Sequence, residues 1–303
     1  MMLVTGGAGF IGSHLVETLV KQGQRVRVLD NLSTGKKQNL AGVLGELELF
    51  VGDVRDRQAV DRAVEGVDVV VHLAALIDVH ESVAKPLLYH EVNCTGTLNL
   101  LEVAKGRVGK LIYASTAAVY GNPFKLPIGE DHPLNPVSPY AASKLSAENY
   151  CLAYLHSYDL KVTVLRLFNV YGPGQGSKGY SGVITKFIER IKGNRPPVIF
   201  GDGKQTRDFI YVDDVIGFIT RALERDAVGT YNVGTGRSVS IRCSADLLLE
   251  LMNRKDLGVT FGDFRPEDVL NSVADMSRSS DAFGLESGIS LREGLSRTIQ
   301  EAG

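Results

Sequence analysis

The sequence predicts an α/β protein with a doubly wound parallel sheet and a smaller α/β substrate-binding domain. In the first half of the chain, short runs rich in Val, Ile and Leu alternate with helix-like segments. This alternation is typical of parallel strands that are covered on both faces. A glycine-rich turn, Gly6-Gly7-Ala8-Gly9-Phe10-Ile11-Gly12, follows the first run. Such a turn between a strand and a helix indicates a Rossmann-like fold.

The first strand–helix–strand unit has the features of a dinucleotide site. Residues 2–5 are expected to form a strand, followed by a helix that ends near Gly23. Gly6, Gly9 and Gly12 let the backbone turn tightly, approach a pyrophosphate and pack the helix on the strand. The N-terminus of the helix then faces the phosphates. The alternative is a degenerate unit of the same shape that binds no nucleotide.

The end of the second strand, residues 25–30, favours NAD over NADP. Asp30 lies there, and its carboxylate fits the hydroxyl groups of the adenosine ribose and would repel a 2′-phosphate. Lys36 and Lys37 follow soon afterwards and weaken this preference slightly, unless they are ordinary solvated loop charges. The sequence therefore predicts NAD as the cofactor.

The alternation continues to the middle of the chain. The remaining expected strands of the sheet are 47–51, 68–73, 110–114 and 161–168, and the expected helices are 57–65, 85–105 and 139–158. Asp53 follows the third strand, and either it contacts the adenine amino group or it caps the next helix. His72 closes the fourth strand, and we interpret it as a hydrogen-bonded strand residue rather than as an acid or a ligand.

The stretch from Ser138 to Lys144 predicts the start of a catalytic helix. Ser138 suits the N-cap and Pro139 the first helical position. Tyr140 and Lys144 are then one turn apart on one face. A free phenol has a pKa of about 10, and both a neighbouring cation and a helix N-terminus favour the phenolate. The ordinary alternative is a half-buried tyrosine beside a solvated lysine.

The fifth strand ends in Ser115 and Thr116, whose hydroxyl groups would point into the ligand crevice. Thr116 could pass a proton between the Tyr140 phenolate and a substrate hydroxyl. The structural alternative for Thr116 is a β-branched strand end.

The second half has a looser pattern. We place the NAD-binding domain at 1–168 and a mainly substrate-binding domain at 169–303, and segments near 209–236 could return to the first domain. Expected helices are 183–192, 212–224 and 240–253, and expected short strands are 198–200, 209–211 and 231–233. Asn169, Arg207 and Arg265 lie in loops here, and two converging arginines would suit a diphosphate.

Composition excludes several classes of protein. Of the 303 residues, 44% are apolar and 22% charged, which is ordinary for a folded domain. The 33 basic and 35 acidic side chains give a net charge of −2, so we expect no nucleic-acid partner. Cys94, Cys151 and Cys243 lack metal-ligand spacing and are expected to be buried thiols. The longest apolar run, 67–77, is too short to cross a bilayer. Four residues before Thr5 leave no room for a signal peptide, so we expect a cytoplasmic protein without a membrane partner.

The ordered motifs together resemble the extended short-chain dehydrogenase/reductases, and most of all the nucleotide-sugar 4-epimerases typified by UDP-glucose 4-epimerase. The motifs extend from the glycine turn and Asp30 to Tyr140-x-x-x-Lys144 and Arg265-Pro266. The resemblance implies Tyr140 as the general base, Lys144 as the residue that holds the NAD ribose and lowers the phenol pKa, and Thr116 as the bridge to the sugar 4-hydroxyl.

The resemblance also implies two sets of binding residues. Those expected to contact NAD are Gly6, Gly9, Phe10, Ile11, Gly12, Asp30, Asn31, Asp53, Val54, Leu73, Ala74, Ala75, Asn93, Ser115, Tyr140 and Lys144. Those expected to contact the UDP-sugar are Thr116, Asn169, Val183, Phe200, Arg207, Arg265, Asp268 and Ser272.

The residues after Thr116 separate reactions within this group. Related dehydratases and decarboxylases place acidic residues there, whereas this chain has Ala117 and Ala118. Without an extra acid or base, the chemistry should stop at reversible oxidation of one carbinol, as in a C4 epimerase of UDP-glucose and UDP-galactose. The alternatives are a UDP-hexuronate 4-epimerase, a nucleotide-sugar reductase and a non-catalytic NAD-binding sensor.

Two further expectations concern the sugar and the assembly. Ser272 falls at the position that lines the pocket at the sugar C2 substituent, so N-acetylhexosamines could also fit. Ile77 replaces a lysine that is often found beside the diphosphate, which leaves the substrate open. In the family, helices such as 85–105 and 139–158 pair across a two-fold axis, which predicts a homodimer. The apolar Leu145, Leu152 and Leu155 would lie at this interface or face their own sheet.

Overall fold

A computed structural model describes residues 1–176, 182–264 and 269–301. Its centre is a seven-stranded sheet with the order β11-β6-β5-β4-β1-β2-β3, and each neighbouring pair is parallel. The strands of this sheet are β1 (Met2–Thr5), β2 (Val26–Asp30), β3 (Glu48–Val51), β4 (Val69–His72), β5 (Lys110–Thr116), β6 (Lys161–Leu167) and β11 (Gly229–Val233). The order in which the strands follow one another across the sheet reverses between β1 and β4. Sheets of this kind bind ligands at this point. The predicted fold class is confirmed.

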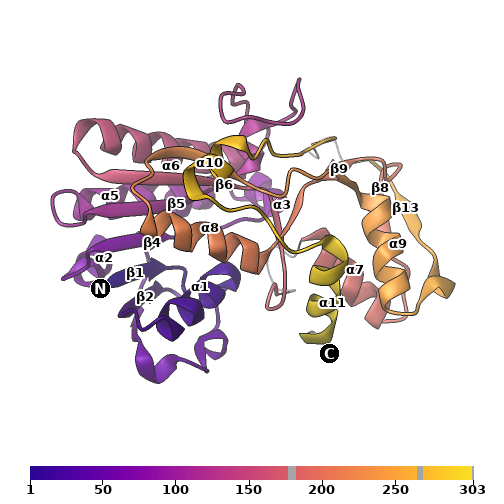
Figure 1. Cartoon of the computed structure of the whole chain (residues 1–303), viewed down its shortest axis with the longest axis horizontal. Coiled ribbons are helices and arrows are strands. Elements are labelled where there is room, and N and C mark those ends of the chain that lie inside the picture. Colours follow the sequence, from indigo (N-terminus) through magenta and orange to yellow (C-terminus); the bar gives the residue numbers. More distant parts are fainter. Residues whose placement is uncertain (177–181, 265–268, 302–303) are drawn as a thin grey trace.

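Helices cover both faces of the sheet (Figure 1). Those of the first half are α1 (Phe10–Lys21), α2 (Arg57–Val64), α3 (Val79–Ala84), α4 (Pro86–Tyr89), α5 (Gly96–Ala104) and α6 (Pro139–Ser157). Those of the second half are α7 (Val183–Lys192), α8 (Val212–Glu224), α9 (Ile241–Leu251), α10 (Ser277–Phe283) and α11 (Leu291–Glu301). Helix α8 packs on α1, so a helix from the second half also covers the nucleotide-binding sheet.

The prediction of one continuous helix over 85–105 is wrong. The segment comprises α4, a π-helical stretch from His90 to Thr95, and α5. A wider helical turn shifts the side-chain register, and Asn93 within it turns its amide towards the backbone of Leu76. Helix α3 was also missed, and its N-cap is Asp78, whose carboxylate accepts a hydrogen bond from the N–H of Glu81.

Part of the second half, including α7, α9 and α11, forms a smaller lobe on the right in Figure 1. Its strands are β7 (Asn169–Tyr171), β8 (Val198–Phe200), β9 (Thr206–Arg207), β10 (Phe209–Tyr211), β12 (Val239–Ser240) and β13 (Thr260–Gly262). They form three two-stranded sheets, β7 with β10, β9 with β12, and β8 with β13. In contrast, β11 pairs with β6 and extends the main sheet.

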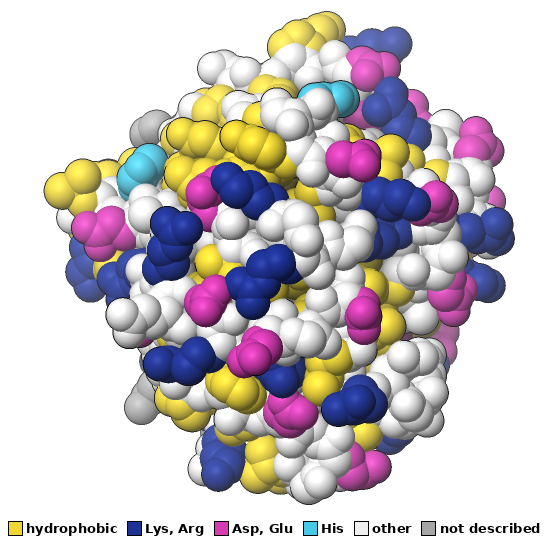
Figure 2. Space-filling view, turned by 90° about the vertical axis from the view of Figure 1, so that its left-hand side faces the viewer, with side chains coloured by type: hydrophobic (Ala, Val, Ile, Leu, Met, Phe, Trp, Pro, Cys, Tyr) yellow, Lys and Arg dark blue, Asp and Glu magenta, His cyan; other side chains and the backbone are white. Residues whose placement is uncertain are grey.

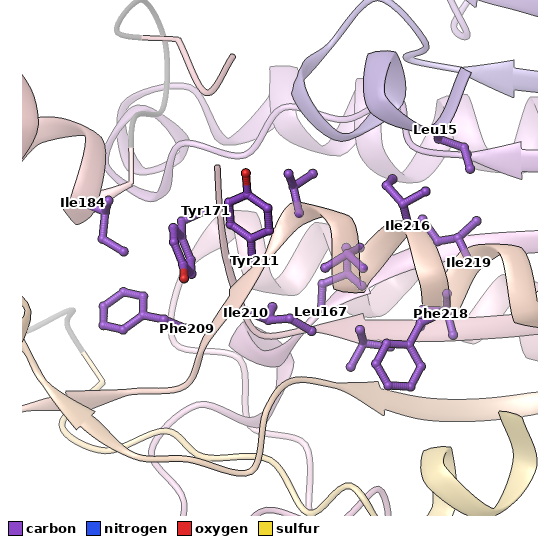
Figure 3. Packing of buried hydrophobic residues seen from close by; sticks show 14 of the residues in the cluster. Leu15, Leu167, Tyr171, Ile184, Phe209, Ile210, Tyr211, Ile216, Phe218 and Ile219 are labelled. Atoms are coloured by element: carbon purple, nitrogen blue, oxygen red, sulfur yellow. The ribbon is translucent and has the colours of Figure 1, made fainter. Parts of the chain in front are cut away.

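The two lobes share one apolar core. Buried residues of α1 and α8 belong to the same cluster as residues of β7, β10 and α7, as the close view in Figure 3 shows. Tyr171 and Tyr211 lie there with ring centroids 5.5 Å apart in an edge-to-face arrangement. Aromatic packing of this kind stabilises the junction between the lobes.

Three expectations about side chains have a structural outcome. Cys94 and Cys151 are buried as expected, but Cys243 is exposed on α9, so its predicted burial is wrong. Leu152 and Leu155 are partly buried against the core of their own sheet, and Leu145 packs on a smaller cluster around Phe168. Leu152 and Leu155 thus face their own sheet in part, and a role of the three leucines at a dimer interface stays a prediction.

The surface gives two further observations. On the face drawn in Figure 2, Lys and Arg side chains are interspersed with Asp and Glu, so the described residues there form no extended basic patch. None of the helices in the described ranges combines the length and the apolar character that a bilayer crossing requires. The cytoplasmic location stays a prediction.

Candidate active site

A cleft of about 900 Å³ lies at the carboxyl ends of the sheet strands and continues into the smaller lobe. This volume is at the upper end of the range for small-molecule sites. Most of the residues predicted to bind the cofactor or the substrate line it. These are Gly6, Gly9, Phe10, Ile11, Gly12, Asp30, Asn31, Val54, Leu73, Ala74, Ala75, Ser115, Thr116, Tyr140, Lys144, Asn169, Val183, Arg207 and Ser272.

The glycine turn needs its glycines for steric reasons. Gly6 has a φ of +70°, and a Cβ there would lie 2.7 Å from the backbone nitrogen of Ala74. A Cβ on Gly12 would lie 2.1 Å from the carbonyl oxygen of Gly6. Gly9 is the N-cap of α1 and provides no side-chain cap, so the first N–H groups of the helix remain available to an anion at this end of the cleft.

Asp30 ties the end of β2 to this turn. Its carboxylate is buried and accepts hydrogen bonds from the N–H groups of Ala8 at 3.0 Å and Leu32 at 2.8 Å. A carboxylate has about four lone-pair sites, so it retains acceptor capacity for two ribose hydroxyl groups. The glycine turn and this carboxylate together fit the pyrophosphate and the adenosine ribose of NAD.

Asp53 does not cap the helix that follows it, and its contact with the adenine amino group stays a prediction. The residue that caps α2 is Asp56, whose side chain accepts from the N–H of Gln58, so the capping alternative is wrong. Asp53 is not among the residues that line the cleft. It pairs with Arg55, which lowers the pKa of its carboxyl to about 2, and it accepts a hydrogen bond from the Asn31 amide at 2.8 Å. Asp53 therefore holds Asn31 at the cleft.

His72 is hydrogen-bonded within the sheet, as interpreted from the sequence. Its ring nitrogens lie 2.6 Å from the Thr5 hydroxyl and 2.9 Å from the Thr97 hydroxyl. Complete burial lowers the pKa of His72 to about 3, so the ring is neutral at physiological pH. A neutral imidazole with a hydrogen bond at each ring nitrogen is a structural link between β1, β4 and α5.

Asn93 lies behind the cleft wall. Its side chain bonds both the N–H and the carbonyl of Leu76 and donates to the Ser143 hydroxyl at 3.0 Å. Leu76 lines the cleft, whereas Asn93 does not. Asn93 therefore fastens the segment after β4 to helix α6.

Helix α6 brings the predicted catalytic side chains to the middle of the cleft. It begins at Pro139, and the Ser138 hydroxyl accepts a hydrogen bond from the N–H of Ala141 at 3.2 Å, as predicted. Tyr140 is 9% exposed and Lys144 4% exposed, and both line the cleft. Thr116 lines it too, at the end of β5. The Tyr140 phenol, the Lys144 ammonium and the Thr116 hydroxyl therefore line the same cleft, where they are partly shielded from solvent.

The Lys144 ammonium is buried against an aromatic ring. Its nitrogen lies 4.3 Å from the centroid of Tyr113, a distance typical of a cation–π contact. Burial lowers the pKa of Lys144 to about 8, while nearby Glu148 opposes the shift. At pH 7 the side chain is still mostly protonated, so it provides a positive charge one helical turn from Tyr140.

The smaller lobe contributes the other wall. Asn169 on β7, Val183 at the start of α7, Arg207 on β9 and Ser272 line it, whereas Phe200 does not. Arg265 and Asp268 lie outside the described residues.

Sequence reasoning missed Gln175, which also lines the cleft. Its side chain donates to the carbonyl of Val170 at 3.1 Å and accepts from the Thr185 hydroxyl at 2.8 Å, which links β7 to α7. Its position directly after the Tyr-Gly-Pro-Gly turn was the available signal.

The fold and the cleft define an NAD-binding protein of the extended short-chain dehydrogenase/reductase class. Residues 2–234 match the model of the NAD dependent epimerase/dehydratase family. The chain belongs to this family, and NAD is its cofactor.

Individual relatives agree with this assignment. The UDP-glucose 4-epimerase of Mycolicibacterium smegmatis is 38% identical over 98% of this chain and 97% of its own length. A solved UDP-N-acetylglucosamine 4-epimerase from Methanobrevibacter ruminantium, in complex with UDP-N-acetylmuramic acid, has a TM-score of 0.95 and 37% identity, covering 99% of this chain and 97% of that one. The Thermus thermophilus UDP-glucose 4-epimerase in complex with NAD has a TM-score of 0.91 and 39% identity, covering 99% and 98%. The predicted resemblance to the NAD-dependent nucleotide-sugar epimerases is confirmed.

Proposed function

We propose that the protein is an isomerase that inverts C4 of a UDP-hexose, interconverting UDP-glucose and UDP-galactose through a 4-keto intermediate. The observation that carries the proposal is the convergence of Thr116, Tyr140 and Lys144 in the same cleft as the glycine turn and Asp30. A base, a hydroxyl relay and a dinucleotide site are the parts that reversible oxidation of a carbinol needs.

The side chains would divide the work as follows. Tyr140, as phenolate, accepts the proton of the sugar 4-hydroxyl, either directly or through the Thr116 hydroxyl. Lys144 favours the phenolate by its positive charge and is placed to bond the nicotinamide ribose. Bound NAD supplies a reversible hydride acceptor. After the keto sugar has turned over within the cleft, the hydride would return from the reduced cofactor to the other face of C4, and Tyr140 would return the proton to O4.

The wall beside Thr116 supports a reaction that stops at this point. Ala117 and Ala118 line the cleft and have no group that could move a proton at C5 or C6 of the sugar. Elimination of water would need such a group. Epimerisation needs only the Thr116 and Tyr140 positions.

The substrate range is proposed to include N-acetylhexosamines. Ser272 lines the cleft and is 7% exposed. Its small side chain leaves more space than a tyrosine would. We expect Ser272→Tyr to abolish turnover of UDP-N-acetylglucosamine while UDP-glucose still reacts. Equal loss with both sugars, or no reaction of the N-acetyl sugar with the unaltered enzyme, would contradict this extension.

The central experiment is a panel of UDP-sugars, including a UDP-hexuronate, monitored for C4 inversion by nuclear magnetic resonance with Tyr140→Phe as the test variant. We expect inversion with the unaltered enzyme and a loss of at least about 1,000-fold in the variant, because it lacks the proton-transferring group. Bound NAD should remain, since the ring is retained. Tyr158→Phe is the control, because Tyr158 is half-exposed at the other end of α6. Stoichiometric consumption of NAD would indicate a reductase instead.

We also propose a homodimer formed by α3, α4 and α6. Val83 is 60% exposed and Leu87 is 77% exposed, and both lie on helices that pack beside α6. Exposed apolar side chains of this size on neighbouring helices fit a self-complementary interface. Light scattering should give a dimer for the unaltered protein and a monomer for Leu87→Glu. A monomer in both cases would exclude the dimer.

A further inference from the structure

A buried ion pair lies behind the predicted proton-transfer residues. Glu148 on α6 is 0% exposed and Arg166 on β6 is 4% exposed. The Arg166 Nη2 donates to Glu148 Oε1 at 2.5 Å, and its Nε donates to the same oxygen at 3.1 Å. The two side chains therefore join the catalytic helix to the sheet through charged hydrogen bonds, which are stronger than neutral ones.

The same ion pair holds both ends of the turn that carries Thr116. At one end, the Ser115 hydroxyl donates to Glu148 Oε2 at 2.5 Å. At the other end, Arg166 Nη1 donates to the Tyr120 hydroxyl at 2.9 Å. Thr116 is the first residue after the first anchor, and the turn from Ala117 to Tyr120 ends at the second.

The carboxylate is in register with the catalytic side chains. Tyr140, Lys144 and Glu148 follow one another at intervals of four residues, so they lie along one face of α6. A shift of Glu148 relative to Ser115 would change the position of Thr116 relative to Tyr140.

Tyr120 extends the connection to the last strand of the sheet. Its hydroxyl donates to the Asn232 side chain at 2.7 Å, and the Asn232 amide donates to the carbonyl of Ile128 at 2.8 Å. Tyr120, the anchor at the far end of the turn, is therefore itself held in place. Arg166 also donates a hydrogen bond to the Glu130 carbonyl at 3.0 Å. A buried, fully bonded network of this kind restricts motion.

Stability alone is a poor explanation for the ion pair. Well-packed apolar residues in place of a buried ion pair are often neutral or stabilising. We propose that Glu148 and Arg166 are positioning residues, which set the distance between the Thr116 hydroxyl and the Tyr140 phenol by fixing the two ends of the Thr116 turn. This inference rests on the proposed function, since it concerns the proton path of that reaction.

The test removes the anchors and leaves the ion pair intact, because Glu148→Gln would leave a buried arginine without its counter-charge and could unfold the protein. The variants are Ser115→Ala and Tyr120→Phe, with Ser115→Thr as the conservative rescue. Ser244→Ala is the matched control, since Ser244 is equally buried and bonds the Ile241 carbonyl in α9, outside the cleft lining.

The readout is the first-order rate of UDP-glucose conversion with NAD-loaded enzyme in saturating excess over substrate. This rate constant does not depend on how much of the protein is folded. We expect it to fall about 10-fold or more in Ser115→Ala and Tyr120→Phe, because a misplacement of about 1 Å can cost about 100-fold. In Tyr120→Phe, whose hydroxyl lies outside the cleft lining, bound NAD and KM should stay unchanged. Ser115→Thr should recover most of the rate lost in Ser115→Ala, and Ser244→Ala should match the unaltered enzyme.

Each outcome has a clear meaning. Unchanged rate constants in both anchor variants, or a loss in Tyr120→Phe that is confined to KM or bound NAD, would overturn the positioning role while leaving the proposed epimerase intact. If the unaltered enzyme fails to convert any UDP-hexose, the proposed function itself fails and the positioning role falls with it.

Discussion

Replacing Lys144 by methionine should make the cofactor-free protein more stable while it abolishes activity. The Lys144 side chain is 4% exposed, and burial lowers its pKa from 10.5 to about 8. The folded state therefore disfavours the charged form that predominates at neutral pH. Methionine has a similar length, is apolar and can occupy the same space beside Tyr113.

The size of the effect follows from two opposing contributions. Each unit of pKa corresponds to about 1.4 kcal/mol, so the charged form costs about 3 kcal/mol at pH 7. The cation–π contact with Tyr113, at 4.3 Å, restores about 1–2 kcal/mol that methionine would lose. We therefore expect Lys144→Met to raise the free energy of unfolding by about 1–2 kcal/mol.

The sign of the pH dependence is fixed by the direction of the shift. Between about pH 8 and 10.5 the unfolded chain retains the Lys144 proton that the folded chain has lost, so the stability of the unaltered protein rises with pH in this window. The advantage of Lys144→Met should be full below about pH 8 and should shrink as the pH approaches 10. The variant itself lacks this contribution.

Urea unfolding of the cofactor-free protein at pH 7 and pH 9.5, followed by circular dichroism, measures this difference. Lys204→Met is the control, since the Lys204 side chain is 89% exposed and its replacement should change stability by less than about 0.5 kcal/mol. A variant that is less stable than the unaltered protein at pH 7, or a difference that is the same at both pH values, would refute the reasoning.

Three further changes have defined outcomes. Gly12→Ala should abolish NAD retention, because the Cβ of the alanine would lie 2.1 Å from a backbone oxygen. Absorbance of the released cofactor measures the retained NAD. Gly45→Ala is the control and should retain NAD, since its Cβ would meet no atom within 4 Å. Asp30→Ala should weaken NAD binding about 10-fold and reduce the preference for NAD over NADP in titrations followed by fluorescence, since it removes a charged acceptor. Asp56→Ala should lower the free energy of unfolding in urea by about 1 kcal/mol through loss of the α2 cap, and an unchanged value would show that the cap contributes nothing.

Local sequence patterns predicted the parts of the site that depend on neighbours in the chain. The glycine turn and Asp30 belong to one strand–helix–strand unit, in which a Cβ on Gly12 would meet the Gly6 carbonyl and Asp30 accepts a hydrogen bond from the turn. The start of α6 could be predicted because Ser138 and Pro139 act on the helix that immediately follows them. The predicted start of α6 agrees with the structure because these two residues act on the first turn of the same helix.

Features that depend on distant contacts could not be predicted in this way. The π-helical stretch around Asn93 lies inside a longer helical segment, and the partner of Asn93 is the backbone of Leu76, seventeen positions earlier. Cys243 was expected inside the protein because free cysteine is usually buried, but the helix register of α9 turns it outwards. Glu148 looked like an ordinary helix residue, since its partner Arg166 lies on another element.

Helix α6 carries two charged side chains that are almost completely buried, Lys144 and Glu148. Among the ion pairs of the described residues, Glu148–Arg166 is the one in which both side chains are less than 5% exposed. Pairs such as Lys21–Glu17 lie in solvent, where they contribute little. Lys144 and Glu148 lie on the same face of α6. At each of these positions the burial of an apolar side chain would cost less free energy than the burial of a charge. Stability alone does not account for these charges, and their position on one helix face agrees with the proton transfer that we propose for that face.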